Sequence, residues 1–366
     1  MIKTIVNWAP IAVFTLLFVV ACKKNDPEPT IEAYLDETPY IIPSSQTLPD
    51  PMIPSDNQLT VQKVKLGRML FYEKALSGDG SMSCATCHKQ ENAFSDINQF
   101  STGIAGLPGH RQAMAIFNLG LNSNGFFWDG RSATLREQSL KPIQDPLEMN
   151  ETLANVVNKV AGMPMYKVQF TKAFGDANVT SERISLALEQ FMFSIVSDNS
   201  KYDQYLRGEL TLNDSEERGR VLFFAEYNPA FPNLSGADCA HCHSGSNFEN
   251  DQYMNNGLDS DIQMNDNGRQ NVTQSAMDKG KFKVPTLRNI ELTFPYMHDG
   301  RFNTLEEVID HYNSGIVSSS TLDPALANTM ATGLMLSTQD KIDLVNFLKT
   351  LTDNTLLTNP AYKTPF

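Results

Sequence analysis

The sequence predicts a mostly α-helical protein made of two similar halves. No stretch alternates apolar and polar residues long enough to form a substantial sheet, whereas several stretches carry apolar residues at helical spacing behind capping residues. A five-residue motif, two cysteines at i and i+3 followed at once by histidine, occurs as Cys84–His88 and again as Cys239–His243. We therefore expect few or no strands, and one copy of the motif at the centre of each half.

The repeated motif is the attachment signature of a c-type haem. Each thiol can form a thioether with one haem vinyl group, and the adjoining imidazole becomes the proximal iron ligand. The chain has five cysteines, and the two motifs use four of them. The sequence thus predicts two covalent haem c groups in two cytochrome c-like domains packed against each other. Their attachment residues and proximal ligands are Cys84, Cys87 and His88, and Cys239, Cys242 and His243.

Paired CxxC motifs have two other interpretations, a four-cysteine zinc site and a thiol–disulfide pair. Histidine follows directly in both copies, and an export signal precedes them. Both features favour haem, because c-type haem is attached outside the cytoplasm.

Residues 1–22 have the pattern of a lipoprotein signal peptide. The apolar run 11–21 is shorter than the roughly 20 residues that span a bilayer as a helix. It closes on a bacterial lipobox whose Cys22 would be lipidated and become the mature N-terminus. We expect a protein exported to the bacterial cell envelope and held by this lipid, on the periplasmic side or at the outer membrane. An uncleaved anchor or a buried cysteine is the alternative.

Composition and net charge limit the domain organisation and the classes of binding partner that fit this chain. The chain has 366 residues, 41% hydrophobic and 19% charged, which suits two globular domains. Its net charge of −13 argues against nucleic acid as a partner and would suit a basic electron-transfer protein.

The first half follows a linker. Residues 23–59, rich in Pro, Asp, Glu, Ser and Thr near the start, predict an extended tether, and residues 60–208 the first haem domain. A helix is expected after Thr60, with Gly67 allowing close approach of another element. Further helices are expected at 132–141, 151–162 and 181–198.

Residues 209–366 are predicted to form the second haem domain. A helix capped by Asn213 or Asp214 is expected over 214–224, then a loop and the second motif. This order repeats that of residues 67–88 and indicates a distant internal repeat. A capping box predicts a helix from Thr304 to about Asn313, and Ser337 should cap a final helix.

The segments between and after the motifs resemble the bacterial di-haem cytochrome c peroxidase family, which includes MauG. The resemblance is carried by residues 118–149, with Phe-Trp-Asp-Gly-Arg at 127–131, and by residues 285–300. It covers nearly all of residues 60–350.

The resemblance assigns roles. The haem at Cys84 and Cys87 becomes the peroxidatic one, and the haem at Cys239 and Cys242 the electron-storage one. Glu148 matches a distal acid–base group, Gln138 an amide that orients peroxide, and Trp128 a residue relaying electrons between haems. On residue type alone, Glu148 would fit a helix-capping or surface charge, and Trp128 a core position.

Three positions depart from the family pattern. Ile104 stands where members that need reductive activation carry a distal histidine. Tyr312 stands where the peroxidases carry a methionine ligand of the second haem, as in MauG, although a core tyrosine fits equally well. A family calcium site matches Thr293 and Pro295, with Gln112 replacing its asparagine. Calcium stays open here.

The resemblance implies an enzyme that reduces H2O2 to water with electrons from a small cytochrome c or cupredoxin. The alternatives are a MauG-like oxidase, which uses H2O2 to oxidise a protein or small molecule, and a non-enzymatic electron-transfer lipoprotein. A homodimer is compatible with the sequence.

Overall fold

The computed structural model describes Met1 and residues 34–366. The predicted signal peptide, Cys22 and the first part of the tether lie outside the described residues. Residues 34–366 belong to one compact unit. In this part of the chain, no helix is long and apolar enough to cross a membrane.

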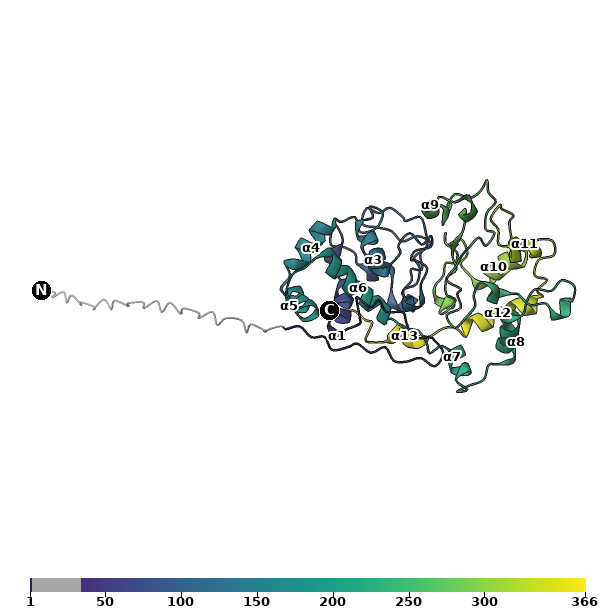
Figure 1. Ribbon diagram of the computed structural model, residues 1–366, viewed down its shortest axis with the longest axis horizontal. Coiled ribbons are helices and arrows are strands. Elements are labelled where there is room, and N and C mark those ends of the chain that lie inside the picture. Colours follow the sequence, from purple (N-terminus) through teal and green to yellow (C-terminus); the bar gives the residue numbers. More distant parts are fainter. Residues whose placement is uncertain (2–33) are drawn as a thin grey trace. The chain divides into compact units, whose positions relative to one another are not determined.

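Helices supply most of the regular structure, which confirms the mostly α class (Figure 1). The strands β1 (Tyr253–Met254) and β2 (Phe282–Lys283) form one short antiparallel pair that aligns Tyr253 with Lys283. The α-helices are α1 (Val61–Phe71), α2 (Cys84–Cys87), α3 (Leu135–Gln144), α4 (Leu153–Ala161), α5 (Pro164–Phe174), α6 (Ser181–Ser194), α7 (Lys201–Leu206), α8 (Asp214–Phe224), α9 (Gln270–Thr273), α10 (Leu305–Asp310), α11 (Pro324–Thr329), α12 (Thr338–Lys349) and α13 (Asn354–Thr358).

Each half is built on one pair of closely crossing helices, α1 with α6 and α8 with α12. A Cβ atom on Gly67 of α1 would lie 1.9 Å from the carbonyl oxygen of Ala187, and one on Gly219 of α8 would lie 1.9 Å from that of Asp343. Only glycine lets the backbones come so close. The expected close approach at Gly67 is confirmed, and its recurrence at Gly219 supports the internal repeat.

An aromatic cluster fills the core beside each crossing. In the first half, the ring of Phe71 lies 5.3 Å from that of Phe191 and 6.2 Å from that of Phe94. In the second half, Phe223 lies 5.3 Å from Phe347 and 5.7 Å from Phe248. Each half therefore has an aromatic cluster at the corresponding place beside its helix crossing.

The two ends of the described chain pack differently from what the predicted domain boundaries imply. Residues 34–59 are extended, but Asp36 N–H donates to Lys172 O at 2.9 Å and Met52 N–H to Gly120 O at 2.7 Å. This part of the predicted tether is held against the body. At the other end, Leu356 and Tyr362 belong to the first core, so the chain leaves the second half after α12. Neither contact leaves a periodic signal in the sequence.

Several helices also differ from expectation. The helix predicted over 181–198 ends at Ser194, because Asn118 bonds to both Ile195 O and Ser197 N and holds that stretch extended. The helix predicted over 304–313 stops at Asp310 and continues as a π-helical turn, His311–Gly315. Ser337 caps α12 as expected, yet α13 follows it. The sequence did not predict α5, α7, α9 or α11.

Gly67→Ala should destabilise the first half, because the added methyl meets rigid backbone. We expect the free energy of unfolding, measured by urea denaturation, to fall by roughly 1–3 kcal/mol. Val61→Ala, at an exposed position of the same helix, should change it by no more than about 0.5 kcal/mol. Equal stability of the two variants would show that the crossing tolerates a side chain.

Candidate functional site

The first motif is held by its own turn and by the core. The Ser83 N–H donates to Thr86 Oγ1 at 2.9 Å across α2. His88 directly follows the helix, and its Nδ1 lies 3.0 Å from the carbonyl oxygen of Phe94. A carbonyl only accepts, so Nδ1 carries the proton and Nε2 keeps its lone pair. Burial lowers the pKa of His88, which keeps the imidazole neutral.

The second motif has the same arrangement. His243 Nδ1 lies 3.1 Å from the carbonyl oxygens of both Phe248 and Pro285. Burial lowers the pKa of His243 to about 4. Each motif therefore presents a neutral imidazole whose Nε2 is the available donor, oriented by a bond from its other nitrogen.

Two cavities adjoin the motifs. The cavity at the first motif has a volume of about 60 Å³, and the cavity at the second motif about 260 Å³. The second volume is close to the lower end of the roughly 300–1,000 Å³ that is typical of ligand pockets. The four motif cysteines are free thiols. Two thiols and one neutral imidazole at an apolar cavity are the donors that a c-type haem requires, so the residues present fit this group.

The first cavity brings together most of the predicted peroxidatic residues. Glu148 and Gln138 line it with Cys84, Cys87 and His88. Burial, and secondarily repulsion from Asp145, raises the pKa of Glu148 to about 7. Near neutral pH this carboxyl can therefore both accept and return a proton.

Ile104 approaches this region through its backbone. Its N–H donates to the carbonyl oxygen of Glu148 at 2.9 Å. Its side chain packs against the first hydrophobic core and offers no metal ligand.

Trp128 does not line the first cavity. It is buried and lines the second cavity, and its Nε1–H donates to the Gln112 carbonyl oxygen at 2.8 Å. Its own carbonyl accepts the N–H of Lys283 at 2.7 Å. The indole is thus fixed where the two halves meet. The Lys283 side chain is itself buried and pairs with Asp251.

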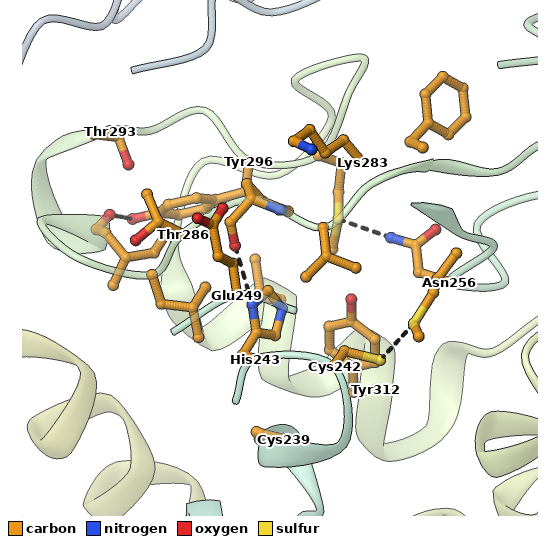
Figure 2. A pocket seen from close by; sticks show the side chains of 18 of the residues that line it. Cys239, Cys242, His243, Glu249, Asn256, Lys283, Thr286, Thr293, Tyr296 and Tyr312 are labelled. Atoms are coloured by element: carbon orange, nitrogen blue, oxygen red, sulfur yellow. Dashed lines mark hydrogen bonds between the residues drawn. The ribbon is translucent and has the colours of Figure 1, made fainter. Parts of the chain in front are cut away.

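Tyr312 lines the second cavity, as its position on the predicted helix face suggested (Figure 2). Burial raises the pKa of Tyr312 above its usual range, and a hydrogen bond from Asn256 partly offsets this. The Asn256 amide also lies 3.2 Å from the Met297 sulfur. Glu249 lines the same cavity, and burial raises its pKa to about 7.

Sequence reasoning missed Lys283, Asn256, Met297 and Glu249. Glu249 and Asn256 fall in the polar stretch 246–280, which has no periodicity and predicted only a loop. Lys283 was invisible because a lysine is rarely buried.

The three residues of the expected calcium site all line the second cavity: Gln112, Thr293 and Pro295. The Gln112 Nε2 donates to Ser95 Oγ at 3.1 Å and to Asp96 O at 3.0 Å, which leaves Oε1 as its acceptor. Amide and carbonyl oxygens suit calcium. Across the described residues, no cluster of three or more His, Cys, Asp or Glu is placed to hold a metal ion.

Comparisons with known proteins agree with this geometry. A family model described as di-haem cytochrome c peroxidase matches residues 61–211. The methylamine utilization protein MauG of Methylophilus methylotrophus is 33% identical over 300 residues, 81% of this chain and 84% of that protein. The cytochrome c551 peroxidase of Nitrosomonas europaea is 37% identical over 249 residues, 67% of this chain and 71% of that protein.

Among solved structures, a MauG-like protein associated with microbial copper homeostasis superposes with a TM-score of 0.78 at 35% identity. The match covers 89% of this chain and 99% of that one. The di-haem peroxidase BthA of Burkholderia thailandensis shares the fold, with a TM-score of 0.65 at 22% identity.

Proposed function

Because the chain belongs to the di-haem cytochrome c peroxidase family, we propose that it reduces hydrogen peroxide to water with electrons from a small cytochrome c or cupredoxin. The observation that carries this proposal is the half-buried carboxyl of Glu148 in the cavity of the first motif. Members of this family contain two c-type haems. Here Cys84, Cys87 and His88 would hold one haem, and Cys239, Cys242 and His243 the other. When bound, haem supplies the redox-active iron that reacts with peroxide.

Glu148 moves the proton. Its carboxylate accepts a proton from one peroxide oxygen and returns it to the departing oxygen, so that H2O2, two electrons and two further protons become two waters. Because its pKa is raised to about 7, the carboxylate form becomes populated as pH rises through neutrality. The amide of Gln138, in the same cavity, orients the peroxide by hydrogen bonding.

The junction of the two halves serves electron delivery. Trp128 is an oxidisable ring that its bond to the Gln112 carbonyl holds in one orientation. Tyr312, in the second cavity, is the candidate second ligand there. An anionic oxygen ligand would favour ferric iron compared with methionine.

A MauG-like oxidase is the second candidate function. Tyr312 and Trp128 line the same cavity, and relatives named MauG match most of the chain. Such an enzyme would take electrons from a protein or small-molecule substrate at a distance.

Glu148→Gln should lower kcat/KM for H2O2 at least ~100-fold, the usual scale of acid–base assistance. The wild-type value should rise with pH through about 7, and the variant should lose this rise. Steady-state oxidation of reduced cytochrome c measures both. Glu182→Gln, at an exposed position of α6, is the matched control and should be unchanged.

Unchanged turnover in Glu148→Gln would remove that residue from the mechanism. No turnover of reduced small redox proteins by the wild type, with peroxide-driven oxidation of another substrate, would favour the second candidate.

We also propose a calcium ion at Gln112, Thr293 and Pro295, supported by the free Gln112 oxygen at a site with oxygen donors. Elemental analysis of the purified protein should find about one calcium per chain, and chelation should lower the melting temperature. Loss of that calcium in Gln112→Leu, without loss of haem, would locate it. Purified protein that contains no calcium, or whose melting temperature does not change on chelation, would contradict the proposal.

We further propose that the protein functions outside the cytoplasm and is anchored to the membrane by a lipid attached to Cys22. The lipobox and the c-type haem motifs support this proposal. Cys22→Ser should move the protein from the membrane to the soluble fraction on cell fractionation. A variant that stays in the membrane fraction would show another anchor.

A further inference from the structure

The loop of residues 101–109 packs backbone against backbone on the segment that carries Glu148. Gly103 lies at the contact. A Cβ atom there would be 2.1 Å from the carbonyl oxygen of Leu147 and 2.6 Å from that of Glu148. Both neighbours are backbone atoms, so they cannot turn aside as a flexible side chain would. The next residue, Ile104, donates its N–H to the Glu148 carbonyl at 2.9 Å.

Backbone hydrogen bonds within the loop of residues 101–109 close it into a hairpin-like turn. The Gly103 N–H donates to Leu107 O at 3.0 Å, and the Gly109 N–H to Ser101 O at 2.9 Å. Thr102 and Pro108 form an antiparallel bridge between these bonds. The Gly103 peptide is therefore fixed within the loop, and the loop presents one surface to Glu148.

A second glycine also contacts the Glu148 segment. The Gly78 N–H donates to the Met149 carbonyl at 2.8 Å, and a Cβ at Gly78 would lie 2.7 Å from the Asn150 carbonyl oxygen. Glu148 N–H itself donates to Asp145 O at 3.0 Å. The backbone of residues 147–150 thus makes close contact with two glycines, Gly103 and Gly78, and a shift at either contact would displace it.

The same loop forms part of the cavity wall. Ser101, Thr102 and Gly103 line the cavity beside Glu148. The distance between the loop and residues 147–148 therefore sets both how deeply the carboxyl is buried and how much water reaches it.

We propose that Gly103 is a positioning residue for Glu148: its missing side chain lets the loop close onto the backbone of residues 147–148 and hold the carboxyl at its depth in the cavity. This inference rests on the proposed role of Glu148, and it adds that the loop backbone creates the working state of that group. Ile104 contributes through its backbone N–H.

The test compares Gly103→Ala with Gly109→Ala in the full haem-loaded protein. A Cβ at Gly109 meets nothing nearer than 3.7 Å, so this control adds the same methyl to the same loop without a clash. Gly103→Ala should lower kcat/KM for H2O2 roughly 10–100-fold, the scale of a misplaced catalytic group. It should also move the inflection of the pH profile from about 7 toward the ordinary 4.5 of a hydrated glutamate. Gly109→Ala should change neither by more than about twofold.

A double-mutant cycle separates positioning from general damage. In the Glu148→Gln background, Gly103→Ala should lower kcat/KM for H2O2 by less than about a further twofold, because the substitution acts through the carboxyl that has already been removed. Hydrogen exchange gives a readout independent of activity: residues 101–109 and 147–150 should exchange faster in Gly103→Ala and at the wild-type rate in Gly109→Ala.

Wild-type kinetics and pH profile in Gly103→Ala would overturn the proposal, as would an equal loss in the Glu148→Gln background. Full activity of Glu148→Gln alone would instead overturn the proposed role of Glu148, on which this inference rests, and would leave the peroxidase function standing. If Gly103→Ala does not fold, Pro108→Gly loosens the loop without adding atoms. It should lower the inflection pH in the same direction, and an unmoved inflection there would overturn the proposal.

Discussion

Backbone contact at two glycines is the constraint from which both sites are built. Gly67 and Gly219 let the paired helices of each half cross at a distance that any side chain would prevent. The crossing brings Phe71 and Phe223 against the aromatic residues that follow each motif, Phe94 and Phe248. The backbone carbonyls of Phe94 and Phe248 accept the bonds from His88 and His243. The helix crossing therefore fixes each imidazole through the core.

The two halves share this frame and differ in what surrounds it. The first cavity receives Gln138 from α3 and Glu148 from the turn after that helix, whereas the second receives Tyr312 and the buried Trp128. Burial raises the pKa of the Glu148 carboxyl in the first cavity to about 7. The second cavity presents aromatic side chains instead. The same helical frame thus carries two chemically different cavities.

The junction between the halves is polar and specific. Arg111 of the first half bonds Asp129 of the same half and Asp266 of the second, each at 2.6 Å. The backbone bond between Trp128 and Lys283 crosses the same boundary. Such contacts fix the relative orientation of the halves more than they add stability, because burying charge costs much of what pairing returns. They also hold the Trp128 indole in one orientation at this boundary.

Local chemistry alone determined the helical class, the two haem motifs, the caps of α1, α8, α10 and α12, and the close approach at Gly67. Each of these features depends on residues that are adjacent or within one helical period in the sequence, so it can be predicted without knowledge of the fold. Tertiary structure decided the rest. The early end of α6 at Ser194 follows from Asn118, and the return of Tyr362 to the first core from contacts far along the chain. The burial that raises the pKa of Glu148, and the fit of Gly103 against its backbone, exist only once segments 101–109 and 145–150 meet.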